Sequence, residues 1–158
     1  DNQSRLSGEP MTIIVREMRK ADIEIAVDIH RKVLREGGTS ERKYDIGDLF
    51  TSFLDKTPHT CFVAEKNGKA VGFIVGSIKE WGFGVEKAGW IEMVEVDPNF
   101  MGAGVGKELG RALLKNYDVE GIREVYTSVR WDSGDLIEFF KSLGFTKSSF
   151  INLVYKSN

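Results

Sequence analysis

Apolar and polar positions follow two different periods along this chain. Some short runs alternate apolar and polar residues or are rich in β-branched residues, which predicts strands. The expected strands are Thr12–Met18, Thr60–Glu65, Ala70–Ile78, Trp90–Val96, Glu124–Val129 and Ser149–Tyr155. The pair Asn67-Gly68 lies between the second and third strands, and this dipeptide is typical of a type I′ hairpin turn.

Other stretches repeat apolar residues every three or four positions, which predicts amphipathic helices. The expected helices are Ala21–Glu36, Ile46–Leu54, Gly104–Lys115 and Ser133–Leu143. The resulting order is strand, two helices, three strands, helix, strand, helix, strand. That order predicts an α/β (α+β) single domain, with a mixed central β-sheet flanked by helices on both faces.

Composition narrows the class of protein. A length of 158 residues suits one domain with a real core, and a net charge of −2 gives no reason to expect nucleic acid as a partner. No apolar run approaches the roughly 20 residues of a membrane helix, and the start of the chain lacks a secretory apolar segment. The single cysteine, Cys61, cannot form an internal disulfide, so we expect a cytoplasmic protein.

The first ten residues are polar and show no pattern. We interpret residues 1–10 as a flexible tail or a cloning remnant, and residues 11–158 as the domain itself.

The most informative stretch follows the strand Trp90–Val96. A proline turn leads into three alternating glycines within Gly102–Gly106, and an amphipathic helix begins there. Glycines let the backbone approach a ligand closely, and the start of a helix offers unpaired N–H groups and the positive end of its dipole. The stretch therefore predicts an anion site, and specifically a site for phosphate.

Two common phosphate loops do not fit this spacing. A nucleoside triphosphate loop would need a glycine where Met101 stands and a hydroxyl where Glu108 stands. A dinucleotide fingerprint starting at Gly102 would need its third glycine at Lys107.

A third pattern does fit. The stretch resembles motif A of the GNAT N-acetyltransferase superfamily, V-x-P-x-x-[R/Q]-x-x-G-x-[G/A], through Val96, Pro98, Gly104 and Gly106. A second stretch, residues 133–145, is similar to the family's N-x-x-A-x-x-x-Y-x-x-x-G-F motif. Motif order and the type of each element agree from about Thr12 to Tyr155.

The resemblance implies acetyl-CoA as cofactor. Backbone N–H groups of the glycine loop would hold the pyrophosphate, and the end of the preceding strand would hydrogen-bond the pantetheine arm. The implied cofactor-binding residues are Val94, Glu95, Val96, Met101, Gly102, Ala103, Gly104, Val105, Gly106, Lys107, Ser133 and Phe140.

The chain departs from the family pattern in four places. Met101 replaces the usual Arg or Gln, which should weaken cofactor binding rather than abolish it. Ser133 replaces Asn and keeps one hydrogen bond, whereas Leu136 replaces a small Ala and narrows the space near the cofactor. Phe140 replaces the Tyr that often protonates the leaving thiolate, so this role falls to water or another residue, or is absent.

The general base is not given by a family motif. We expect Glu92 first and Glu95 second, because a carboxylate among apolar neighbours acquires a raised pKa. Strand alternation places Glu92 on one face with Trp90, Val94 and Val96. Tyr126 and Tyr155 lie on later strands and are further candidates to face the cleft. A structural ion pair is the alternative for Glu92.

Other reactive residues give weaker signals. His30 and His59 are too far apart in sequence to suggest a metal site, and we expect no metal. Cys61 on a strand is typical of a small buried residue. Trp81, Trp90 and Trp131 fit either an acceptor cleft or ordinary aromatic packing.

The predicted function is acetyl-CoA-dependent N-acetyl transfer to a primary amine, by direct attack on the thioester. The acceptor would be a protein N-terminus or lysine, or a small-molecule amine, and a homodimer remains open. Family members choose the acceptor mainly through segments that correspond here to Gly37–Tyr44 and Thr146–Asn152. The alternative is a non-catalytic acyl-CoA-binding or regulatory module.

Overall fold

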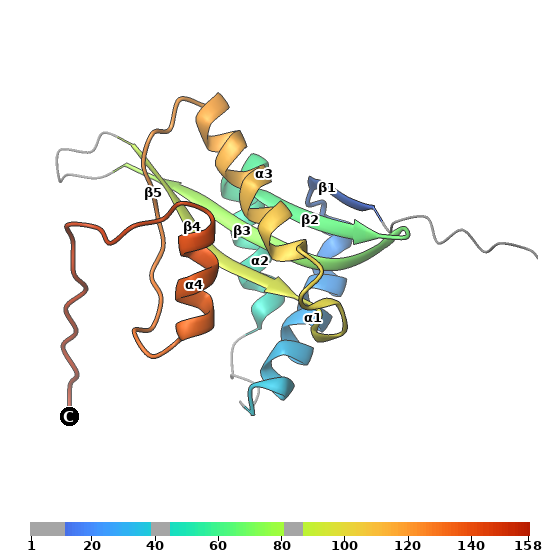
Figure 1. The fold of residues 1–158 in the computed structure, drawn as a ribbon, viewed down its shortest axis with the longest axis horizontal. Helices are drawn as coiled ribbons and strands as arrows, with labels where there is room; N and C mark the ends of the chain where they lie inside the picture. The colour runs from blue at the N-terminus through green and yellow to red at the C-terminus, as the bar shows by residue number, and fades with distance from the viewer. Residues whose placement is uncertain (1–11, 39–44, 81–86) are drawn as a thin grey trace, which may run out of the picture.

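The computed structural model describes residues 12–38, 45–80 and 87–158 of the chain. Within these ranges a five-stranded sheet carries two α-helices on each face (Figure 1). The strands are β1 (Ile13–Glu17), β2 (Cys61–Lys66), β3 (Lys69–Lys79), β4 (Ala88–Val96) and β5 (Val125–Tyr126). The α-helices are α1 (Ile23–Glu36), α2 (Ile46–Lys56), α3 (Val105–Val119) and α4 (Gly134–Ser142). The predicted fold class is confirmed.

The sheet is mixed. Its spatial order follows the sequence from β1 to β5; the first four strands pair antiparallel, and β4 pairs parallel with β5. The β2–β3 hairpin turns at Asn67 and Gly68, whose φ angles are 53° and 75°. Two positive φ angles are what a type I′ turn requires, so the predicted turn is confirmed.

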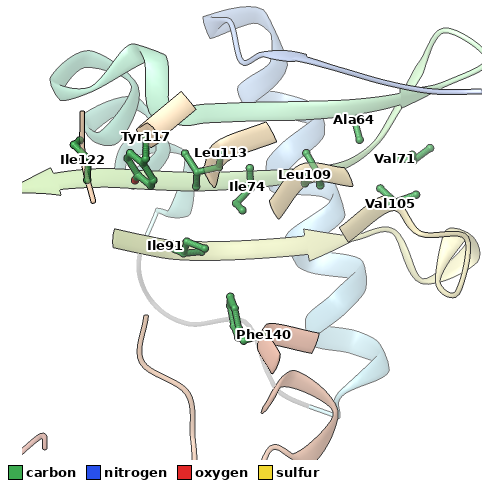
Figure 2. Packing of buried hydrophobic residues seen from close by; sticks show 10 residues of the cluster. All are labelled: Ala64, Val71, Ile74, Ile91, Val105, Leu109, Leu113, Tyr117, Ile122 and Phe140. Carbon is green, nitrogen blue, oxygen red and sulfur yellow. The ribbon is translucent and has the colours of Figure 1, made fainter. Parts of the chain in front are cut away.

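Each face of the sheet has its own apolar core. On one face, α3 and α4 bury Leu109, Leu113, Tyr117 and Phe140 against β2, β3 and β4. Figure 2 shows the α3 side chains lying over the strands, whereas Phe140 approaches Ile91 from another direction. On the other face, α1 and α2 bury a second cluster, which includes Ala26, Ile29, Phe50, Leu54, Phe73 and Val75.

The C-terminal part of the sheet differs from the prediction. The strand expected over Glu124–Val129 is reduced to the two residues of β5. The strand expected over Ser149–Tyr155 is wrong, because these residues form no strand, and Leu153, Val154 and Tyr155 are at least 80% exposed. β-Propensity alone does not form a strand when the described structure offers no surface on which its side chains pack.

Some predictions fall outside the described residues. These are the N-terminal tail at 1–10, the loop at 39–44 and the position of Trp81. None of the helices in the described ranges is long and apolar enough to span a membrane.

Candidate functional site

A β-bulge in β4 shapes the centre of the site. Gly76 of β3 lies opposite Ile91, whereas the preceding Val75 lies opposite Met93, so Glu92 is an extra residue in β4. A bulge bends its strand and redirects the side chains that follow. The alternation inferred from sequence is therefore interrupted at Glu92.

This bulge corrects one prediction. Val94 and Val96 pack with Ile91 on the face covered by α3. The Glu92 carboxylate instead accepts a hydrogen bond from the Ser77 hydroxyl at 2.5 Å. Gly76 points toward Tyr117 of α3, so its neighbour Ser77 points to the opposite face. Glu92 therefore does not share a face with Val94 and Val96.

Beside the bulge, β4 and β5 separate. Their pairing covers only Gly89 with Val125 and Trp90 with Tyr126. After that, the Thr127 hydroxyl donates to the Ile91 carbonyl at 3.0 Å, and the two segments diverge. A cavity of about 200 Å³ opens there, lined by Ile91, Glu92, Met93, Val94, Glu95, Thr127, Ser128, Leu136 and Phe140.

The divergence leaves an unpaired edge along β4. In the described part of the chain, no strand pairs with Glu92–Val96 on the β5 side. An unpaired strand edge offers N–H and C=O groups to an extended ligand, as if to an added strand. The cavity can therefore hold an extended, amide-containing molecule alongside β4.

The glycine loop lies just after β4 and is shaped to approach a ligand. Gly102 and Gly104 have φ angles of 79° and 82°, which favour glycine, and no described heavy atom lies within 4 Å of a Cβ built on either. In α3 the N–H of Glu108 donates to the carbonyl of Gly104 at 3.1 Å. The N–H groups of the preceding residues, Val105 to Lys107, are left for an external acceptor such as a phosphate.

The third glycine of the motif has a different role. A Cβ on Gly106 would lie 3.2 Å from the Phe139 ring of α4 and 3.7 Å from Val96. Gly106 therefore permits close packing between α3 and α4, and its neighbours Gly102 and Gly104 are the two that keep the surface open.

Buried Asp97 holds the turn between β4 and the glycine loop. Its carboxylate accepts hydrogen bonds from the Asn99 N–H at 3.0 Å and from the Lys32 ammonium at 3.2 Å. Burial pushes the pKa of Asp97 upward, but these donors outweigh burial and leave the pKa below its usual value. Asp97 thus fixes the path of the chain into the loop.

Glu95 forms a largely buried pair with His30, a residue for which the sequence predicted no role in the site. The Nδ1 atom of His30, in α1, lies 2.9 Å from both carboxylate oxygens of Glu95. Burial raises the pKa of Glu95, and the hydrogen bond from His30 offsets part of that rise. The two residues are 65 positions apart, and the only local signal was a histidine on a mostly apolar helix face.

Glu92 is paired as well. Besides Ser77, its carboxylate contacts the Lys79 ammonium at 3.2 Å. The structural ion pair that was the alternative role for Glu92 therefore exists, although Glu92 also lines the cavity.

The remaining predicted residues fall into two groups. Ser133 is the N-cap of α4 without a side-chain bond to that helix, and Phe140 lines the cavity while packing edge-on against Phe139 and Phe145. Tyr155 is 91% exposed on the C-terminal segment and is not among the cavity-lining residues. Tyr126 donates to Glu124 and packs against Trp90. Among the described residues, no cluster of three or more His, Cys, Asp or Glu could hold a metal.

A family model agrees with this geometry. The model described as "Acetyltransferase (GNAT) family" matches residues 24–145. This chain belongs to the GNAT family. The match includes β4, the glycine loop and α4, and it ends at Phe145, before the exposed C-terminal segment.

Relatives of this GNAT chain include two curated acetyltransferases. An N-alpha-acetyltransferase of Sulfurisphaera tokodaii is 28% identical over 149 residues, covering 89% of this chain and 84% of that protein. A mycothiol acetyltransferase of Amycolatopsis mediterranei is 33% identical over 89 residues, which cover 54% of this chain and only 30% of that longer protein.

Solved structures share the fold. Ard1 from Thermoplasma volcanium is 28% identical with a TM-score of 0.72, covering 87% of this chain and 84% of that one. Aminoglycoside N-acetyltransferase AAC(6')-Iy in complex with CoA is 22% identical with a TM-score of 0.74, covering 96% and 99%. At that identity the second likeness concerns the fold alone.

Proposed function

We propose that this GNAT protein transfers an acetyl group from acetyl-CoA to a primary amine, through direct attack of the amine on the thioester. The observation that carries the proposal is the cavity at the open edge of β4, which is lined by two carboxylates and lies on the strand that leads directly into the glycine loop. The N-alpha-acetyltransferase relative supports a peptide N-terminus as the first acceptor to test.

The residues present fit a CoA-type cofactor. The amides of Met101, Gly102, Ala103, Gly104, Val105, Gly106 and Lys107 surround the helix start and suit a pyrophosphate. Val94, Glu95 and Val96 offer the unpaired edge of β4 to the pantetheine amides, and Ser133 and Phe140 close the cavity from α4. The cofactor would supply an activated acetyl group; the protein supplies its position and the removal of a proton.

Glu92 is the proposed general base. It lies at the bulge, lines the cavity and is more exposed than Glu95, with 23% against 14% of its side chain accessible. Glu95 is the second candidate, since both of its oxygens already contact His30. An acceptor ammonium must lose one proton before its nitrogen can attack.

The test starts with calorimetric titration of acetyl-CoA and free CoA, followed by thiol release with a panel of amines. The panel contains an N-terminal peptide, a lysine peptide, a polyamine and an aminoglycoside. We expect one-site cofactor binding, and we expect Glu92→Gln to lower kcat/KM by about 10²–10⁴-fold without changing cofactor affinity. The matched variant Glu95→Gln should lose less, and the reverse ranking would transfer the base role to Glu95.

A non-catalytic acyl-CoA-binding module is the second candidate function. Two observations favour it: Phe140 places a ring without a hydroxyl at the cavity, and Met101 is 69% exposed where the family has a polar side chain. Such a module would bind acetyl-CoA in the calorimeter and release no thiol with any amine of the panel.

A further inference from the structure

The ammonium of Lys79 occupies a small cation site next to the cavity. Its Nζ atom lies 4.3 Å from the centroid of the Trp90 ring and 3.2 Å from Oε1 of Glu92. The Ser77 hydroxyl donates to the same Glu92 oxygen and holds the carboxylate in place. An aromatic face together with a carboxylate is the combination that recognises ammonium ions. We call Trp90, Glu92 and Ser77 the ammonium seat.

The seat lies where an acceptor would approach. Glu92 is a cavity-lining residue, and Trp90 pairs across the sheet with Ser77 on the face opposite α3. From Trp90, a row of rings continues across β5, because Tyr126 is 5.6 Å from Trp90 and Phe150 is 5.9 Å from Tyr126. The seat is thus one end of a partly exposed aromatic surface.

Lys79 is held there loosely. Its side chain is 40% exposed, so its ion pair and its contact with the ring are both weakened by water. A lysine on a flexible stem can leave such a site, whereas Trp90 and Glu92 are fixed by the strand.

We propose that the ammonium seat binds the ammonium group of the acceptor, and that Lys79 is a built-in competitor which the acceptor displaces. The inference rests on the proposed function and adds a ligand class, the primary alkylammonium ion. Displacement of Lys79 would bring the bound ammonium into contact with Glu92. When no acceptor is bound, the ion pair with Lys79 would keep the Glu92 carboxylate paired with a cation.

The test uses n-butylammonium chloride as probe, without acetyl-CoA, and follows the indole N–H signal of Trp90 by NMR. Lys79→Met removes the competing charge and keeps an apolar stem on the ring. We expect it to bind the probe about fivefold more tightly than the wild type, as expected for the loss of one exposed competing cation. Lys79→Arg should bind like the wild type, and neutral 1-butanol should show no difference between the proteins.

A matched control distinguishes the loss of a charge at the seat from a change in the net charge of the protein. Lys115→Met removes the same charge from an exposed position on α3, on the opposite side of the sheet, and should leave affinity unchanged. Adding Glu92→Gln to Lys79→Met should remove the gain, with circular dichroism verifying the fold. Equal affinities of the wild type and Lys79→Met, or an equal gain in Lys115→Met, would overturn the proposal.

The binding test does not require turnover, so failure of the seat and failure of the proposed reaction can be told apart. Probe binding as expected in a protein that releases no thiol would leave the alkylammonium site standing, and would refute the transfer reaction and with it the acceptor as the ligand of the site. Turnover with an acceptor KM unchanged by Lys79→Met would refute the seat and leave the proposed function intact.

Discussion

The two faces of β4 are built from opposite chemistry. Toward α3, the strand presents Ile91, Val94 and Val96, all within one apolar cluster. Toward α1 and α2, it presents Glu92 and Glu95 beside the apolar Trp90 and Met93, and each carboxylate is held by polar groups from another element. One extra residue at the bulge separates these two patterns.

This difference shows how one strand can be both a rigid support and a reactive surface. The face toward α3 is specified by volume, because close-packed side chains leave no room for additional atoms. The opposite face also carries charged side chains, and burial raises the pKa of one of them, Glu95. Substitutions on the first face should therefore alter stability at every pH, and those on the second should alter its pH dependence.

The largest effect is expected under α3 at Gly76 of β3, the strand next to β4, where the packing leaves no room for a Cβ. A Cβ on Gly76 would collide with the Tyr117 hydroxyl and lie 3.0 Å from the carbonyls of Thr60 and Trp90. Gly76→Ala should lower the free energy of unfolding by about 2 kcal/mol, the usual scale of overpacking. Urea denaturation at pH 5 and pH 8 should give the same loss.

The control for this crowding is a double-mutant cycle. Tyr117→Phe removes the colliding oxygen, at the cost of hydrogen bonds to Trp90 and Ser77. The double variant should lose less than the sum of the single losses. Gly134→Ala, at an open position of α4, should cost nothing. Additive losses would contradict the volume argument.

A smaller effect, with a pH signature, is expected on the polar face. Burial raises the pKa of Glu95, so the folded protein binds this proton more tightly than the unfolded chain does. The contribution of Glu95 to stability is then complete below its unfolded pKa of about 4.5 and declines as pH rises through its folded pKa. Glu95→Gln should remove that decline, which urea denaturation of both proteins across pH 4 to 8 measures.

Asp22 provides a control of opposite sign. The Arg16 guanidinium donates to both oxygens of Asp22 and lowers the pKa of this carboxyl. Its stabilising effect is present above the unfolded pKa and lost as pH falls through the folded pKa. Asp22→Asn should therefore differ most from the wild type near neutral pH. A slope of the same sign for both variants would contradict the assignment of the two environments.

The sequence predicted the elements around the site much better than it predicted the bulge and the side-chain pairs within it. The strand Trp90–Val96, the glycine loop and the helix after it follow local periodicity, and all three are present. The bulge at Glu92 could not be found this way, because alternation assumes that each residue has one partner. The pairs of Glu95 with His30 and of Glu92 with Lys79 each join residues of two different elements, so the periodicity of one element does not reveal them.

The C-terminal segment was mispredicted for a related physical reason. Ile151, Leu153 and Tyr155 suit a strand by composition, but strand formation depends on a partner edge and a surface to cover. The contacts that join this segment to β5 and the residues after it include a hydrogen bond from Asn152 to Ser128 and a ring contact between Phe150 and Tyr126. Placing Tyr155 in the cleft depended on that strand.

The smallest effect is expected at the glycine loop, where the two faces of β4 end. Met101 is 69% exposed, so Met101→Arg should change the free energy of unfolding by less than about 0.5 kcal/mol. A guanidinium at this exposed position of the loop would add a charged donor for a pyrophosphate bound there. The Kd for CoA should fall about three- to fivefold at low salt, and most of that gain should vanish in 0.5 M NaCl because ions screen exposed charges.

Met101→Leu is the neutral control, and calorimetry at two salt concentrations measures both variants. If the gain in CoA affinity persists in salt, or if the leucine variant also binds more tightly, the loop does not bind the anionic groups of the cofactor.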